Sequence, residues 1–329
     1  MIVTFFDAVV VVSLISLAWR SITVVRLQVS IVTFLPYGLL MALAWARLGA
    51  PDVAIAEAAI GGGLTSALLL VAARRVQRAA KSTRGDSRPT AGRRVTRRRR
   101  TTAALGAITV AVALMATLWV LPADSGGLRP MVEANLEASG VGNPVTAVLL
   151  NFRAYDTMLE IAVLVLALIG VGILRTSDSA IAKEHAGRST GLGDTMFGSL
   201  VRLFLPVIVV TAGYLLWRGA DDPGGAFQAG AVLAGGGVIA VLAQISQPQW
   251  LTDSLVRFAA AIGLIVFVGV GVLVVPFGYA FLEYPRDWSK VLILVIEMAA
   301  TVTVASILLI LFTWTLGRGK AATERGDPS

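Results

Sequence analysis

The sequence contains no cysteine and a single histidine, His185, and only 15% of its 329 residues are charged. The absence of cysteine excludes thiolate metal sites, iron–sulfur clusters and disulfide bridges. A single histidine excludes a multi-histidine metal site within one chain, and we expect no cofactor. A soluble globular domain is about 25% charged. The low charge, together with 56% hydrophobic residues, therefore predicts an all-α polytopic membrane protein.

Nine apolar runs follow one another along the chain, each near the ~20 residues that are needed to cross a bilayer. They are predicted to be helices, because lipid offers no water to unpaired backbone groups and the runs are too long and too uniformly apolar for barrel strands. The first run carries Asp7 and lacks the basic start of a signal peptide, so we expect it to be retained as a span. The runs cover residues 2–19, 29–46, 53–73, 103–121, 158–174, 200–217, 227–245, 255–275 and 291–316.

One loop is strongly basic: twelve of the 28 lysines and arginines lie between Arg74 and Arg100, opposed by Asp86 alone. Binding of nucleic acid through the arginines at 97–100 is one reading of this cluster. We favour a cytoplasmic loop under the positive-inside rule, because predicted spans flank it on both sides. This orientation predicts an outer N-terminus and a cytoplasmic C-terminus in a multi-pass protein of the cell membrane, bound to lipid and not to nucleic acid.

Two polar linkers divide the spans into groups of three, two and four. Neither linker has an apolar period, so we expect both to lack regular structure. In the outer part of the middle group, Asn143 and Pro144 predict the start of a short interfacial helix. The predicted division is a three-span module at 1–77, a basic linker at 78–100, a two-span module at 101–175, a linker at 176–196, a four-span domain at 197–318 and a cytoplasmic tail at 319–329.

Four acids lie within or at the start of spans that are predicted to run from outside to inside: Asp7, Glu57, Glu160 and Glu297. A charged side chain at the bilayer centre costs ~2.5 kcal/mol or more, so these residues are candidates for a proton or cation relay. The alternative is a carboxylate that is paired with Arg or Lys, or one that stays wet near the surface. Glu57 is the strongest candidate, about 9 Å along the helix from Pro51.

Two further acids have a structural alternative. Asp156 lies three residues after Arg153 and four before Glu160, so the three share a face if one helix runs through them. That arrangement fits a relay or a salt-bridged helix start. Pro51 and Asp52 are typical of a helix start, where a carboxylate complements the helix dipole. Asp52 and Glu57 are five residues apart, about 140° around a helix, so they cannot form a simple pair.

The sixth and seventh spans are joined by the residues Asp222, Pro223, Gly224, Gly225, Ala226, Phe227 and Gln228. Pro-Gly-Gly predicts a sharp outer turn, and Gln228 is placed to hydrogen-bond across helices. The glycines at 61–63 and 235–237 lack the strand and helix context of a phosphate loop. They are predicted to allow close helix contacts instead.

The 222–230 segment resembles the signature turn of the B subunit of Mrp-type multisubunit sodium/proton antiporters. Pro, both glycines, Phe and Gln agree with the family pattern, whereas Asp222 replaces Ser and alanines at 226 and 229 replace Gly. Glu297 resembles a family glutamate, with Met298 in place of a small residue. Residues 49–57 and 143–160 resemble small membrane modules of the Mrp A subunit, which also occur in membrane-bound hydrogenases.

The resemblance implies an integral, non-enzymatic subunit of a monovalent cation/proton antiporter. It implies large proton-pumping subunits and small membrane subunits as partners, and a cation path on which Glu57 is the residue we expect. Two alternatives stay open. The chain is either an ion-translocating membrane subunit of a hydrogenase or related respiratory complex, or a structural scaffold. No span interior contains a lysine, so a lysine relay would have to come from other subunits.

Overall fold

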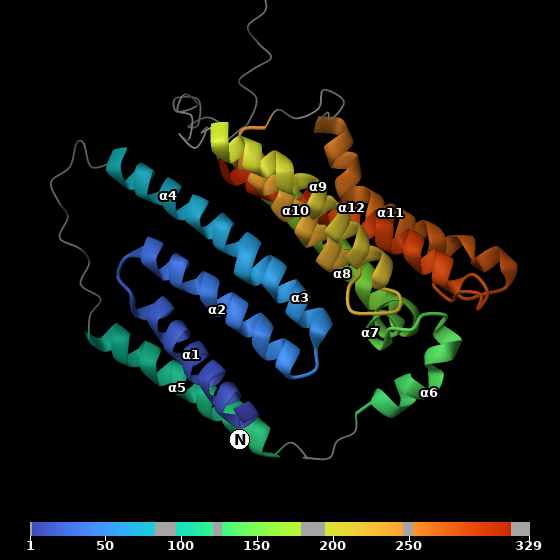
Figure 1. Cartoon of the computed structure of the whole chain (residues 1–329), viewed down its shortest axis with the longest axis horizontal. Coiled ribbons are helices and arrows are strands. Elements are labelled where there is room, and N and C mark those ends of the chain that lie inside the picture. The colour runs from blue at the N-terminus through green and yellow to red at the C-terminus, as the bar shows by residue number, and fades with distance from the viewer. Residues whose placement is uncertain (1, 83–96, 121–126, 179–194, 246–252, 317–329) are drawn as a thin grey trace, which may run out of the picture. The chain divides into compact units, whose positions relative to one another are not determined.

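The computed structural model describes residues 2–82, 97–120, 127–178, 195–245 and 253–316, and these ranges contain helices and no strand (Figure 1). They form two compact units, one of Met1–Ala73 with Asn135–Ser329 and one of Arg74–Ala134. The all-α prediction is confirmed. Residues 83–96 and 179–194, which include most of both predicted linkers and His185, lie outside the described ranges.

Each predicted apolar run forms a helix whose ends fall close to the predicted ones. In chain order the helices are α1 Ile2–Thr23, α2 Leu27–Arg47, α3 Pro51–Ala59, the π-helix η1 Ile60–Thr65, α4 Ser66–Ser82, α5 Arg97–Val120, α6 Arg129–Ser139, α7 Pro144–Ala147, the π-helix η3 Val148–Phe152, α8 Ala154–Asp178, α9 Thr195–Arg218, α10 Ala226–Leu242, α11 Asp253–Leu273, the 3₁₀-helix η5 Val275–Phe277 and α12 Ser289–Leu316.

Among the described residues, eight helical stretches are long and apolar enough to cross a membrane, and the chain is a multi-pass membrane protein. The ninth predicted span, α10, is shorter, with 17 residues. At 1.5 Å per residue it is about 25 Å long. It ends at Leu242 because Gln244 takes a left-handed backbone, with φ +56°, and its amide turns back to bond the Val241 carbonyl.

Helical structure extends further than the sequence predicted. Helix α4 continues to Ser82 and α5 begins at Arg97, so both ends of the first predicted linker are helical. Helix α6 was not predicted at all. Its Arg129 and Glu133 form an i,i+4 ion pair at 2.8 Å, a spacing that is visible in the sequence and favours a helix.

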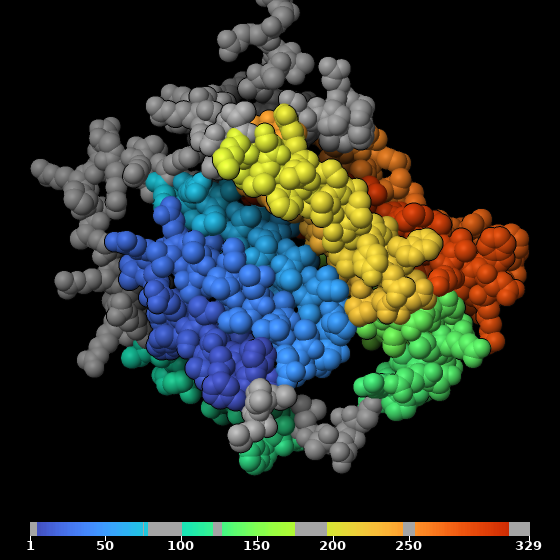
Figure 2. All heavy atoms as spheres, viewed as in Figure 1, coloured from blue at the N-terminus to red at the C-terminus, as the bar shows by residue number. Residues whose placement is uncertain are grey.

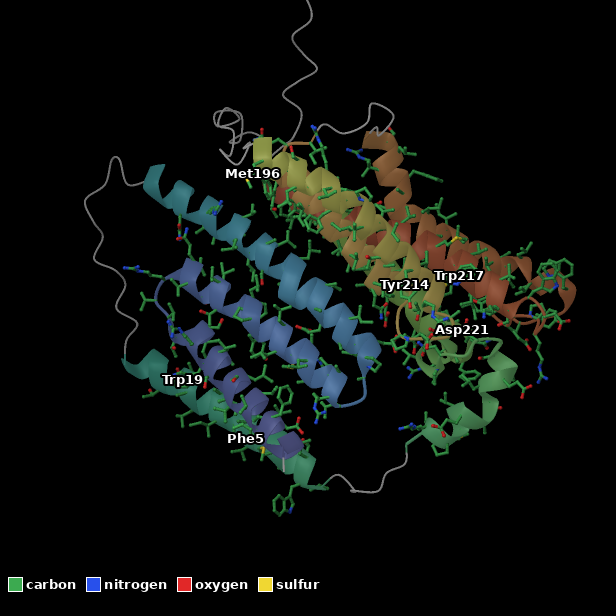
Figure 3. All side chains as sticks on the ribbon, in the orientation of Figure 1. Phe5, Trp19, Met196, Tyr214, Trp217 and Asp221 are labelled. Atoms are coloured by element: carbon green, nitrogen blue, oxygen red, sulfur yellow. The ribbon has the colours of Figure 1, made fainter. Side chains whose placement is uncertain are left out.

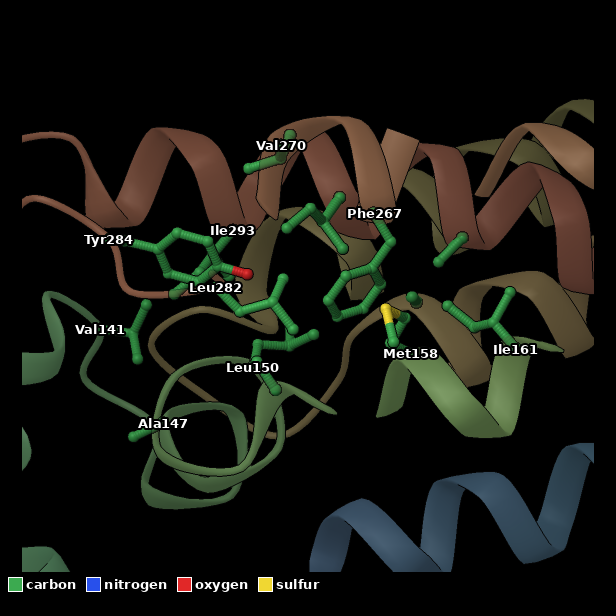
Figure 4. Packing of buried hydrophobic residues seen from close by; sticks show 14 of the residues in the cluster. Val141, Ala147, Leu150, Met158, Ile161, Phe267, Val270, Leu282, Tyr284 and Ile293 are labelled. Atoms are coloured by element: carbon green, nitrogen blue, oxygen red, sulfur yellow. The ribbon is translucent and has the colours of Figure 1, made fainter. Parts of the chain in front are cut away.

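The core of the first unit lies where α7, η3 and α8 pack against α11 and α12 (Figure 4). Phe267 of α11, Ile161 of α8 and Ile293 of α12 are completely buried there. Helix α10 contacts α9 and α12 of its own group of spans and α3 of the first group. The start of α10 is therefore within reach of residues from distant parts of the sequence.

Helix α9 covers one side of α10 and leaves its own outer face bare, as Figure 2 shows in yellow spheres on the viewing face. Leu203, Val210 and Trp217 on this helix are each about 70% exposed. A helix of span length with a bare apolar face is suited to lipid or to the apolar surface of another subunit.

Small residues set the closest helix approach in this unit. A Cβ atom on Gly38 of α2 would lie 2.7 Å from the backbone nitrogen of Gly62 in η1, so only glycine fits. In α10, a Cβ on Gly236 would lie 2.8 Å from Ile208, and one on Gly237 would lie 3.0 Å from Leu309. Both glycine clusters therefore allow close helix contacts, as predicted.

The Gly38 contact predicts that Gly38→Ala lowers the stability of the folded chain. Overpacking of a close contact costs about 1–3 kcal/mol, so the melting temperature of the purified protein in detergent should fall. Gly213→Ala is the matched control, because Gly213 lies in helix α9 with nothing within 4 Å of the added atom. Equal melting temperatures for the two variants would show that the close contact at Gly38 does not require glycine.

Candidate functional site

The turn between α9 and α10 is tight because its glycines leave no room for side chains. A Cβ on Gly224 would overlap the Leu215 carbonyl, and one on Gly219 would lie 2.5 Å from Gly225. Gly225 has φ +111°, a backbone conformation that L-residues rarely adopt. Its amide donates to the Leu215 carbonyl at 2.9 Å. The turn thus directs the amides of Gly224 and Ala226 away from α9.

Asp52, in the first turn of α3, binds this turn. The residue is buried, with 7% of its surface exposed. Oδ1 accepts hydrogen bonds from the Gly224 amide at 3.0 Å and from Asn143 Nδ2 at 3.4 Å. Gln228 Nε2 donates to the Asp52 carbonyl at 3.2 Å, so it does bond across helices as predicted. The prediction gave Asp52 only a helix-dipole role within α3. Its side-chain hydrogen bonds instead reach the turn before α10 and the start of α7.

Asn143 joins the middle group of helices to the same point. Its Oδ1 accepts from the Val145 amide at 2.8 Å and caps α7, which confirms the predicted helix start at Asn143 and Pro144. Its Nδ2 also donates to the Asp222 carbonyl at 2.9 Å. We call the set Asp52, Asn143, Gly224 and Gln228 the Asp52 junction. It brings the starts of α3, α7 and α10 together.

Two ion pairs flank the junction. Lys290 Nζ lies 2.9 and 3.0 Å from the two Asp221 carboxylate oxygens, and Asp222 pairs with Arg218. Figure 3 labels Asp221 at the end of α9. The hydrogen bond from Lys290 holds the pKa of Asp221 below its usual value. Asp222 therefore uses its side chain for Arg218 and its carbonyl for Asn143. These contacts fix the part of the loop that precedes the glycines.

Glu297 approaches the turn from α12. It is only 2% exposed, and it accepts a hydrogen bond from the Ala226 backbone amide at the start of α10. Within the described ranges, Oε2 has no hydrogen-bond partner and no Lys or Arg lies within 4.0 Å of the carboxylate. Gly225 packs directly on this group, since a Cβ there would lie 2.9 Å from Oε1.

Glu57 lies at the end of α3, immediately before the π-helical segment η1. Its side chain is half-buried and folds over Gly61, where a Cβ would overlap the carboxylate. Among the described residues it has no ion-pair partner. π-helical turns occur frequently at functional sites, and nothing in the apolar period of the sequence indicated this one.

The remaining acids differ in their surroundings. Asp7 pairs with Arg47 at 2.9 Å, so the paired alternative holds for it. Asp156 pairs with Arg153, but α8 begins at Ala154, so the predicted helix does not run through Arg153. The cause is the backbone of Arg153, which leaves the helical region at φ −130°, ψ 38°. Glu160 is exposed on α8.

These carboxylates are separate sites rather than one cluster. No hydrogen bond or ion pair in the described part of the chain joins Glu57, Glu160 and Glu297. A search of the same residues finds no group of three His, Asp or Glu side chains that would hold a metal ion. Chemically, each isolated carboxylate inside an apolar helix layer is able to take up a proton or a single monovalent cation.

Comparison with known families divides the chain into two matched regions. Residues 196–314 match a family described as a domain related to the MnhB subunit of Na+/H+ antiporter, and residues 8–78 match the MbhD family, the D subunit of MBH. The sequence is 27% identical over 277 residues to the A/B subunit of a probable K(+)/H(+) antiporter of Rhizobium meliloti, covering 77% of this chain and 27% of that protein. It is 31% identical over 146 residues to an uncharacterised protein of Methanocaldococcus jannaschii, covering 40% of this chain and 56% of that protein.

Two solved structures share the fold. The Mrp complex from Dietzia sp. DQ12-45-1b matches with a TM-score of 0.74 at 24% identity, over 98% of this chain and 35% of that chain. The membrane-bound sulfane sulfur reductase, an archaeal respiratory membrane complex, matches with a TM-score of 0.50 at 22% identity, over 65% of this chain and 97% of that chain. The chain thus spans about a quarter of its bacterial relative and about half of its archaeal one.

The Asp52 junction predicts that Asp52→Ala is strongly destabilising. The change leaves the buried Gly224 amide without its acceptor and removes one of the two acceptors of Asn143 Nδ2, at a cost of about 1–3 kcal/mol. Thermal unfolding of the purified chain should show a lower midpoint. Asp287→Ala serves as the control, because Asp287 is exposed in the loop before α12. Indistinguishable midpoints would show that the junction does not hold the helices together.

The Asp221–Lys290 pair predicts a small acid-dependent contribution to stability. Because the pKa of Asp221 is lowered in the folded chain, its contribution is present above the ordinary aspartate pKa and is lost as the pH falls below roughly 4. Both side chains are about half exposed, so the contribution should be under ~1 kcal/mol. Unfolding midpoints measured across this pH range should fall less steeply for Asp221→Asn than for the parent chain. Identical pH dependences for the variant and the parent chain would contradict a contribution of the Asp221–Lys290 pair to stability.

Proposed function

The chain joins an MbhD domain at residues 8–78 to an MnhB-related domain at residues 196–314, and from this premise we propose that it is an integral subunit of a monovalent cation/proton antiporter complex of the cell membrane. In this proposal it is not an enzyme. It contributes carboxylates within the membrane to the ion path, and it helps the complex to assemble. Its modules are residues 1–77, 101–175 and 197–318.

The observation that carries the proposal is a pair of carboxylates on apolar spans without basic partners. Glu57 is half-buried and Glu297 almost fully buried, and within the described residues neither forms an ion pair. Keeping ionisable groups among apolar helices is costly, and residues of this kind mark ion paths and proton relays in membrane proteins. Glu57 is the residue we place on the cation path, with Glu160 and Asp156 as further candidates at the start of α8.

The proposed partners are large proton-pumping subunits and other small membrane subunits. The chain spans only 27% of its bacterial antiporter relative, so most of that relative has no counterpart here. No span interior contains a lysine. The bare apolar faces of α9 and of α5, whose described side chains from Thr101 to Val120 are all exposed, suit contacts with such subunits.

The cation is proposed to be sodium. The matched MnhB-related family is named for a Na+/H+ antiporter, whereas the bacterial relative is named for K(+)/H(+) exchange. Proton exchange measured with sodium as the only cation, and again with potassium as the only cation, distinguishes the two possibilities. A carboxylate that binds a cation singly discriminates weakly between sodium and potassium, so the neighbouring subunits would complete the selectivity.

A second candidate function is ion translocation in a respiratory complex. It is favoured by the match to the MbhD family and by the fold shared with the sulfane sulfur reductase complex. It is the weaker candidate, because the relative that covers 77% of the chain is named as part of an antiporter. Purification of the intact complex separates the two: nickel or iron–sulfur subunits would support the respiratory assignment.

The proposal predicts that Glu57→Gln abolishes cation-dependent proton exchange in membrane vesicles while the complex still assembles. Glutamine keeps the size of the side chain but cannot exchange a proton or balance a cation. Glu137→Gln is the matched control, because Glu137 is exposed on α6 outside the spans. Exchange is measured by fluorescence quenching of a pH-sensitive dye, and assembly by native electrophoresis.

Unaltered exchange in Glu57→Gln would remove Glu57 from the ion path. A purely structural scaffold predicts more than this: single neutral substitutions of Glu57, Glu160 and Glu297 would each leave exchange intact, with losses only where assembly fails.

A further inference from the structure

Two carboxylates meet the start of α10 from different helices. Asp52 of α3 accepts from the Gly224 amide at 3.0 Å, and Glu297 of α12 accepts from the Ala226 amide. Gly225 lies between them, and its lack of a side chain lets Glu297 reach the turn. The start of this helix is therefore shared by an acid from the first group of spans and an acid from the last.

Only one of the two carboxylates is satisfied. Asp52 Oδ1 has two donors, whereas Glu297 Oε2 is fully buried and has no hydrogen-bond partner among the described residues. The side chain of Glu297 is 2% exposed, so bulk water does not solvate it. A buried carboxylate oxygen without a donor is costly. Binding of a proton or a cation at this carboxylate lowers that cost.

No basic side chain in the described part of the chain balances Glu297. The charged groups on the elements around it are engaged with each other or lie away from it. Three ion pairs engage most of them: Arg218 with Asp222, Lys290 with Asp221, and Arg153 with Asp156. Asp52 of α3 accepts a hydrogen bond from Gly224. Glu160 of α8 and Arg257 of α11 are exposed.

The surroundings favour a proton over a metal cation. A hard cation is held by several oxygen ligands, whereas the contacts that the structure gives for the Glu297 carboxylate are the hydrogen bond from the Ala226 backbone N–H and the close approach of Gly225. The positive end of the α10 dipole also lies here, which repels a metal cation. A proton needs one oxygen lone pair and no further ligands.

The geometry points to a proton-binding site at Glu297, beside the Ala226 amide at the start of α10. Binding forms one O–H bond at Oε2 and changes the charge of the group from −1 to 0, without any redox step. This inference rests on the proposed function and deepens it by naming the ligand of one of its carboxylates.

The test is infrared difference spectroscopy of the detergent-solubilised intact complex, recorded as the pH is changed, with and without ¹³C labelling of glutamate. The unaltered complex should show a protonated-carboxyl band that shifts on labelling and that titrates. Glu297→Gln should remove this band, and Asp287→Asn should leave it. Persistence of the full band in Glu297→Gln would overturn the proposal. If that variant fails to assemble, Glu297→Asp provides the same test, because the band then loses its sensitivity to glutamate labelling.

Since no transport is measured in this experiment, its failure is distinct from a failure of the proposed antiport.

Discussion

A backbone amide inside a membrane protein must find a partner within the protein, and the amide of Gly224 finds the carboxylate of Asp52. Lipid supplies little hydrophobic drive for helices to associate, so polar contacts and close packing hold the groups of spans together. The bond joins residues that are 172 positions apart in the sequence. Asn143 donates to the same carboxylate oxygen, so residues from three groups of spans meet at one atom.

The glycines of the turn explain which departures from the family pattern the fold tolerates. At Gly224 a side chain would strike the Leu215 carbonyl, and at Gly225 the backbone has φ +111°. Both are kept. Ala226 and Ala229 stand where the family usually has glycine, but both lie within α10, where a helical backbone accepts alanine without strain. The pattern is thus required at the two positions where geometry leaves no choice.

The sequence was sufficient to predict the helices, because an apolar run of membrane length has few other conformations. It also predicted the start at Asn143 and the role of Gln228, since both follow from side-chain chemistry close to a turn. It did not predict that Asp52 binds Gly224 or that Asp7 pairs with Arg47, because neither partner is near in sequence. The assignments of Glu57, Glu160 and Asp156 to an ion path remain predictions, as do the module boundaries.

The π-helical segment η1 changes what a single span is able to present to its surroundings. A π turn holds one more residue than an α turn, so everything after Thr65 is rotated by about 100° relative to a continuous helix. Before the segment, the buried side chains are Asp52 and Ala54; after it, they are Ser66 and Ala73. One inserted residue thus changes the direction in which every later side chain of this span points. The insertion lies beside Glu57, so it also fixes how that carboxylate is presented relative to the second half of the same span.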